Sequence, residues 1–303
     1  MGLRRTLGGG VVAVLMFSVA PAAALSPALR GPTVASVLRV IPLDPGTVTT
    51  FTASCPAGFV ATSGGVYTPL PGAAATHIAP SGSSDWQFRI STAPGAKAGY
   101  VTVAVACAKV PNEGFASAPK LRVRTVRSDP VELAPGDRET VALDCPADSA
   151  PVGFGYDRQG GPVGAPAAKI TRAVPARGGW SFSATNTATG DSAPDAAVTF
   201  YATCLGRTVT AMDTRRKRLQ QHLRIATALS RLPLHAGGNV LVSACPAGSI
   251  GIGAGFSLSG RATSADGAAV TLGGGRFTLA SEGQSSAALY LQCLSQKTRF
   301  KSR

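Results

Sequence analysis

The chain has 303 residues, with 36 Gly, 22 Pro and only 15% charged residues, and amphipathic helical spacing is nearly absent. This composition excludes a helical bundle and favours many short strands joined by turns. Lys and Arg outnumber Asp and Glu by 29 to 15, which gives a formal net charge of +14 and leaves few acids for acid–base catalysis.

The N-terminus has the pattern of a secretory leader. Arg4 and Arg5 precede the apolar run 11–20, and the small residues 22–24 follow it. The run is too short to span a bilayer, so the pattern predicts a signal peptide over residues 1–24 and an oxidising, extracellular destination. Residues 296–303 carry neither an apolar anchor nor a wall-sorting motif. We therefore expect a secreted protein that is released or held on the cell wall by non-covalent binding.

All six cysteines belong to a threefold repeat of about ninety residues per unit. A Cys-Pro step starts each motif, and a second Cys follows roughly fifty to sixty residues later. Six cysteines allow 15 pairings, and the repeat selects one because equal units should close in the same way. The expected disulfides are Cys55–Cys107, Cys145–Cys204 and Cys245–Cys293.

Each unit repeats the same series of expected strands. A strand, a turn and a second strand precede the first Cys, at 37–54, 121–144 and 223–244. Pro-Gly or Gly-Gly within the turn indicates a hairpin or a tight turn. A Gly-rich apolar stretch follows at 60–67, 152–156 and 250–256, and then a strand headed by an aromatic residue at 86–90, 180–184 and 276–279. The closing strands, at 100–107, 198–204 and 288–293, carry the second Cys.

Two-residue alternation predicts which side chains enter the core. In the first closing strand, the valines at 101, 103 and 105 share a face with Cys107. Trp86 and Trp180 each stand two residues before a Phe, so we expect Trp86, Trp180, Phe88, Phe182 and Phe277 to be buried. The alternative is that both Trp rings line an open groove that binds glycans by stacking.

These patterns predict an all-β protein of three tandem disulfide-stapled modules, sandwich or prism-like, at 33–116, 117–212 and 219–303. Two arrangements remain open. The modules can pack as a compact body with pseudo-threefold symmetry, in which the strand before each Pro-Gly turn pairs with a neighbouring unit. They can also form beads on a string, joined at the Pro-containing segments 118–119 and 128–130.

The sequence resembles a known group of secreted proteins. Cys-Pro-Ala-Gly at 55–58 and 245–248, the Gly-rich stretch, the Trp-x-Phe strand and the closing Cys strand resemble a repeat of high-GC Gram-positive (actinobacterial) bacteria. The resemblance covers nearly the whole mature chain and implies a secreted β-module, but it supplies no catalytic residues. The chain departs from the pattern at Asp148 and at Arg276-Phe277, where Gly and Trp stand in the other units.

Basic residues cluster after each second Cys, and such a field attracts polyanions by salt-sensitive forces. The candidate binding residues are Arg122, Arg124, Arg127, Arg215, Arg216, Lys217, Arg218, Arg224, Lys297 and Arg299. In the compact arrangement we expect these segments at the three joints, with Arg124, Arg224 and Arg299 in a ring. Expected partners are a wall polymer, an acidic glycan, anionic lipid headgroups or DNA. The competing interpretation is that the charge only keeps a secreted protein soluble.

The run 215–218 has its own alternatives. It can be a protease-sensitive linker or a short basic helix on an anionic surface, or a solvated loop that leads into a strand at Leu223.

Catalytic and metal-binding motifs are missing from the sequence. His77, His222 and His235 stand at non-equivalent places, and the acids are scattered near turns. With every cysteine in a disulfide, thiolate catalysis and a cysteine zinc site are excluded, so we expect no metal, no cofactor and no enzymatic activity. The sequence favours a surface-binding protein. The alternatives are a self-associating envelope component and a cryptic hydrolase with a site between units.

Overall fold

The computed structural model describes residues 31–67, 70–112, 115–117, 119–190, 192–213, 216, 218–235, 237–271, 274–295 and 301–302. Every helix or strand in this part of the chain is a β-strand, which confirms the predicted all-β class. The expected signal peptide and four of the candidate binding residues lie outside the described residues. Those four are Arg215, Lys217, Lys297 and Arg299.

The described strands form four antiparallel sheets, and the first unit contributes three strands to each of two of them. One sheet has the order β1-β6-β3, with β1 (Thr33–Leu43), β6 (Gly99–Lys109) and β3 (Val60–Tyr67). The other three, in the order β2-β5-β4, begin a seven-stranded sheet that continues into the second unit; they are β2 (Val48–Ser54), β5 (Asp85–Thr92) and β4 (Ala73–Pro80). The Pro45–Gly46 turn is tight, with Gly46 at a φ of 69°, and it carries the chain from one sheet to the other. It does not close a hairpin.

The second and third units repeat this strand order. In the second unit, the counterpart of β1-β6-β3 is made of β8 (Val123–Arg127) and β9 (Val131–Leu133), β14 (Ala196–Gly206) and β11 (Ser149–Gln159). The counterpart of β2-β5-β4 is made of β10 (Arg138–Asp144), β13 (Gly179–Asn186) and β12 (Ala168–Ala176). The third unit has β17 (Ile225–Leu234), β18 (Gly237–Ser243), β19 (Ser249–Thr271) and β20 (Gly274–Ser295). The two long strands, β19 and β20, each take the place of two strands of the other units, because β20 pairs with both β17 and β18.

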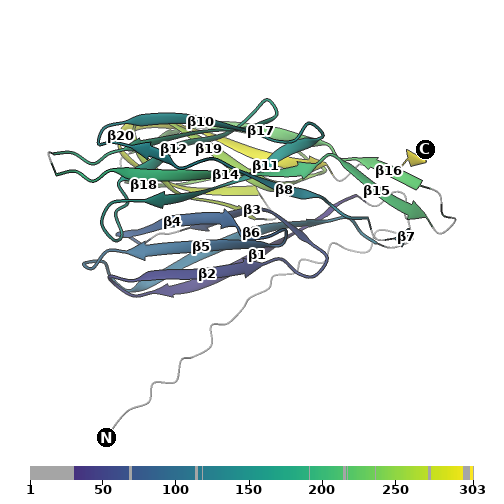
Figure 1. Cartoon of the computed structure of the whole chain (residues 1–303), viewed down its shortest axis with the longest axis horizontal. Coiled ribbons are helices and arrows are strands. Elements are labelled where there is room, and N and C mark those ends of the chain that lie inside the picture. The colour runs from purple at the N-terminus through teal and green to yellow at the C-terminus, as the bar shows by residue number, and fades with distance from the viewer. Residues whose placement is uncertain are drawn as a thin grey trace, which may run out of the picture.

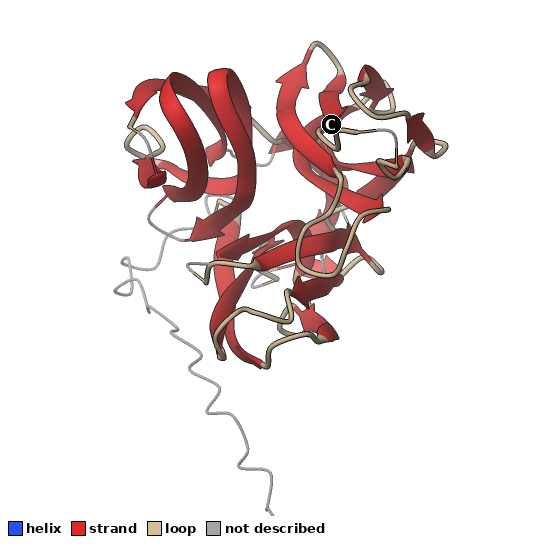
Figure 2. Ribbon diagram, turned by 90° about the vertical axis from the view of Figure 1, so that its left-hand side faces the viewer, coloured by secondary structure: helices blue, strands red, loops and turns tan. Residues whose placement is uncertain are grey.

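Hydrogen-bonded strands connect the units to one another. His77 and Ile78 of β4 pair with Asp157 and Tyr156 of β11, and β12 pairs with β19 in the same way. The strands before the turns pair within their own units, as β1 does with β6, so the expectation that they cross to a neighbour was wrong. Between the third and first units, β19 and β3 are in contact, but no pairing between them is found in the described residues. Figure 2 shows the sheets arranged around a central region.

The centre is formed by one β-bulge from each unit. The ladders of β3, β11 and β19 shift register at Thr62, Val152 and Ile252, and all three residues are fully buried. The Thr62 hydroxyl donates a hydrogen bond of 2.7 Å to the Ile252 carbonyl. A Cβ on Gly253 would lie 1.4 Å from the carbonyl oxygen of Val152. The backbones of the bulged strands therefore lie almost in direct contact, with little room for side chains between them.

The predicted aromatic core is confirmed where the side chains are described. Trp86, Trp180, Phe88 and Phe182 are fully buried, which excludes an open Trp groove. The Phe277 side chain lies outside the described part. The second cysteines face the core as expected, with exposures of 1% or less.

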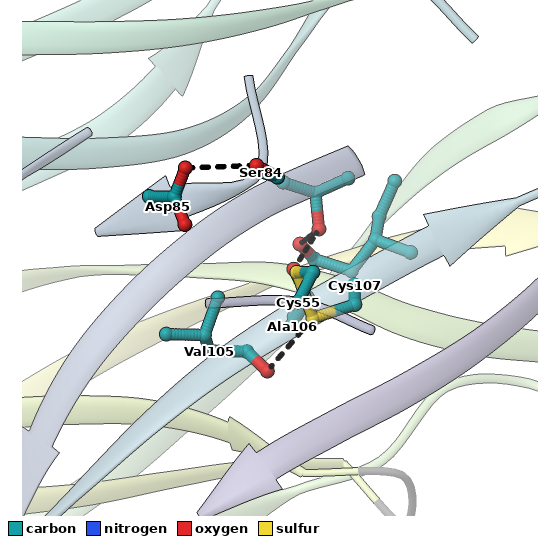
Figure 3. The surroundings of a disulfide bond; sticks show 8 residues. Cys55, Ser84, Asp85, Val105, Ala106 and Cys107 are labelled. Atoms are coloured by element: carbon teal, nitrogen blue, oxygen red, sulfur yellow. Dashed lines mark hydrogen bonds between the residues drawn. A yellow bond between two sulfur atoms is a disulfide. The ribbon is translucent and has the colours of Figure 1, made fainter. Parts of the chain in front are cut away.

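The three expected disulfide pairings are confirmed. Figure 3 shows the first of them, where Cys55 at the end of β2 meets Cys107 in β6. The Cys55 amide donates a 2.8 Å hydrogen bond to the Ser84 carbonyl, just before β5. In the first and second units the bond therefore links strands of two different sheets, beside the Cys-Pro turn that carries the chain between the same two sheets.

A fourth sheet, which the sequence did not predict, is built from the segments that follow the second Cys of each unit. It has the order β21-β16-β15-β7, with β7 (Phe115–Ser117), β15 (Thr208–Asp213), β16 (Arg218–His222) and β21 (Lys301–Ser302). In Figure 1 it extends from one end of the body. Leu223 and Arg224 fall between β16 and β17, so the strand expected from Leu223 begins only at Ile225.

Candidate polyanion-binding groove

The closing strands of all three units end in one apolar cluster beneath the fourth sheet. Ala108, Leu205 and Leu294 each directly follow the second Cys of a unit, and they are buried in this cluster together with Val152 and Ile252. The basic segments that follow the second cysteines therefore begin at one end of the body. The prediction placed them at three separate joints. The cationic side chains at this end are Lys109, Lys120, Arg122, Arg124, Arg207, Arg218 and Arg224.

Four of these cations line one groove. It has a volume of about 740 Å³ and lies between the Cys-Pro turn of the first unit and the start of β8. Its basic residues are Lys109, Lys120, Arg122 and Arg124, and among the described residues no Asp or Glu lines it. Phe59, which directly follows Cys-Pro-Ala-Gly, adds an aromatic ring to the wall.

The backbone fixes the positions of the two arginines. The Arg122 carbonyl accepts a 2.8 Å hydrogen bond from the Gly206 amide, and Arg124 lies opposite Cys204 in the β8–β14 ladder. Residues two apart on an extended chain project to the same side, about 6.6 Å from one another. Both side chains are exposed. The Lys109 ammonium lies 4.5 Å from the centre of the Phe59 ring, a cation–π contact that holds the lysine at the groove wall.

The groove cations have no carboxylate partner within the described residues. The ion pairs found there are those of His77 and Arg89 with Asp157, on the seam between β4 and β11. Four cations around one open hollow therefore produce a local positive field that no acid of the described residues neutralises.

The other candidate residues lie apart from the groove. Arg127 is exposed at the far end of β8 and lies 5.8 Å from the centre of the Tyr201 ring. The Arg224 carbonyl accepts a 2.9 Å hydrogen bond from Ser295, so Arg224 occupies the place of Arg122 and not of Arg124. The expected ring of Arg124, Arg224 and Arg299 therefore does not use equivalent positions.

Arg216 and Arg218 are exposed near the β15–β16 connection, and Arg216 has a φ of 59°. This part of the 215–218 run connects two paired strands of the fourth sheet.

The binding residues expected from the sequence include two of the four groove cations, Arg122 and Arg124, and they do not include Phe59. The only signal was its place after Cys-Pro-Ala-Gly, where the other units have Ser149 and Ser249. Within the described residues, no three His, Cys, Asp or Glu side chains gather as metal ligands would. In the same part of the chain, no helix is long and apolar enough to cross a membrane.

Comparisons with known proteins add no assignment to this geometry. Neither the comparison with protein-family models nor the comparison with curated proteins finds a match for the chain.

Proposed function

We propose that this protein is a secreted, non-enzymatic binding protein that holds a polyanionic polymer of the cell envelope or its surroundings in the groove beside β8. The observation that carries the proposal is the convergence of Lys109, Lys120, Arg122 and Arg124 on one hollow, with no acid among the described residues of its lining. Three disulfides are compatible with an extracellular location.

The groove's chemistry suits a polymer of phosphate-linked sugars or polyols. Arginine forms paired hydrogen bonds with phosphate oxygens, and lysine adds a compact point charge. The Phe59 ring offers a flat apolar surface against which a sugar ring or a carbon backbone can pack. An open groove suits a long chain better than an enclosed pocket does, because the polymer can enter from the side and leave at both ends.

The test is the salt dependence of binding to purified phosphodiester wall polymer, measured by fluorescence anisotropy with the labelled polymer. The double variant Arg122→Ser/Arg124→Ser should bind more weakly. The slope of log affinity against log salt should fall by about 1.5 to 2, because two phosphate contacts are lost. The matched control is Arg138→Ser/Arg231→Ser, which removes the same charge from exposed positions in β10 and β17.

The proposal is wrong if both double variants lose affinity equally, because net charge alone would then explain binding. Competition with single-stranded DNA and with a uronic-acid polymer identifies the preferred anion. If either competitor binds more tightly than the wall polymer, the groove remains the binding site but its ligand belongs to a different class of polymer.

A further inference from the structure

A second cationic site lies away from the groove, at the opposite end of β14. Its central residue is Arg158 in β11, which pairs with Val198 near the start of β14 and is only 4% exposed. One guanidinium nitrogen donates a 3.2 Å hydrogen bond to the Ala168 carbonyl in β12, and another donates to the Ala75 carbonyl in β4. Arg158 therefore connects the first unit with both sheets of the second.

No acid in the described part of the chain neutralises the charge of Arg158. Among the described residues, no carboxylate lies within ion-pair distance of it, and its Nε is buried without a hydrogen-bond partner. The carbon of the guanidinium lies 5.0 Å from the centre of the Tyr156 ring, which supplies only a weak attraction. A buried cation is costly unless an anion or a full set of acceptors accompanies it.

The fold itself does not need a cation at this position. Leu258 stands in β19 at the place that Arg158 takes in β11, two residues after the Phe or Tyr that pairs with the neighbouring unit. Leu258 is 9% exposed and packs in the apolar core. An apolar side chain therefore fills this position in the third unit, and the arginine of the second unit calls for a different explanation.

Two hollows flank Arg158 beneath the loop between β11 and β12. One has a volume of about 450 Å³ and is lined also by Lys169 and Thr187. The other, of about 200 Å³, is lined also by Arg89 and Ser91. Both hollows share Arg158, and no Asp or Glu lines either of them within the described ranges of the chain.

The loop above these hollows is held in place by close backbone contact. Gly164 has a φ of 81°, and a Cβ there would lie 2.2 Å from the Ala93 nitrogen. The Gly164 amide donates a 3.1 Å hydrogen bond to the Ser91 hydroxyl of the first unit. The roof of the site is thus preorganised across the seam between two units.

We propose that this cleft binds a compact oxyanion, a phosphate or sulfate group, with Arg158 as its buried counter-ion and Lys169 as a second cation. The larger hollow has the size of a small-molecule site, so the group can be the free ion or the end of a small organic molecule. This site is independent of the polymer groove, because none of its cations lines that groove.

The test is thermal unfolding of the whole protein in inorganic phosphate against sodium chloride at equal ionic strength, followed by calorimetric titration. Phosphate should raise the melting temperature by several degrees over chloride, because a ligand that binds only the folded state stabilises it. The variant Arg158→Leu, which copies Leu258, should fold and lose this increase. Lys169→Gln should reduce it, and Arg122→Ser/Arg124→Ser should keep it.

Each result has a definite reading. No phosphate effect beyond chloride in the natural protein overturns the proposal, and so does an increase that persists in Arg158→Leu. If Arg158→Leu does not fold, Lys169→Gln decides in its place, since an unchanged phosphate effect there contradicts the site. Stronger stabilisation by glycerol phosphate than by inorganic phosphate identifies the group as part of a larger ligand, and equal stabilisation identifies the free ion. If only Arg122→Ser/Arg124→Ser loses the phosphate effect, phosphate binds in the groove beside β8 and the proposed cleft is not its site.

Discussion

Gly253→Ala tests whether the three bulged strands meet as closely as the structure shows. A Cβ at Gly253 would stand 1.4 Å from the Val152 carbonyl oxygen. Ordinary contact needs about 3.4 Å, so the strands would have to separate by about 2 Å. A backbone carbonyl cannot rotate out of the way as a side chain can. The added methyl therefore acts on the seam between the second and third units.

The expected cost lies at the upper end of the range for overpacking, about 3 kcal/mol. For a chain of this size that corresponds to a melting temperature about 6–10 °C lower. The assay is thermal unfolding followed by circular dichroism, with urea unfolding as a second measure. Gly95→Ala is the matched control, because a Cβ there has nothing within 4 Å and its change in stability should stay within about 0.5 kcal/mol.

A Gly253→Ala variant that melts within about 1 °C of the natural protein would refute the close approach of the strands. The equivalent position in the first unit shows that this close approach is not found at every seam between units. Ser63 holds the place of Gly253 and carries a side chain, and it lies where β3 and β19 touch without pairing.

Two further predictions concern stability. Replacing Cys145 and Cys204 by Ser opens a link across 59 residues and should lower the free energy of unfolding by about 4 kcal/mol in the chain-entropy model, measured by urea unfolding; an unchanged midpoint would contradict it. Burial raises the pKa of Asp157, but the His77 hydrogen bond and the Arg89 charge outweigh it and hold this pKa below its ordinary value. A lowered folded-state pKa gives stability that is present above the ordinary value, near 3.8, and is lost as the pH falls through the folded value. The melting temperature of Asp157→Asn should therefore fall less steeply below pH 4 than that of the natural protein. If the two melting temperatures fall in parallel with pH, the lowered pKa of Asp157 does not contribute to the acid sensitivity.

The parts of the fold that repeat within a unit could be predicted from the sequence. The disulfide pairing followed because three equal patterns admit one equal solution, and the burial of Trp86 and Phe88 followed from two-residue alternation. Both depend on local spacing, which a sequence displays directly.

The connections between units could not be predicted in the same way. The pairing of His77 with Asp157 joins residues 80 positions apart in different units, and nothing near either residue indicates the other. The fourth sheet was missed because its strands are short and come from segments that resembled linkers. The groove shows both cases: its arginines stand out as a charge cluster, whereas Phe59 becomes relevant only once folding brings it beside Lys109.

The meeting of the three bulges bears on what a single chain can do that three identical chains cannot. Subunits of a symmetric trimer must place the same residue at each central position. Here Thr62, Val152 and Ile252 differ, and only the first carries a hydroxyl, which reaches the carbonyl of the third. A single chain can therefore hold three different contacts, so that two joints are tight and glycine-lined while the remaining one is closed by the Thr62 hydrogen bond.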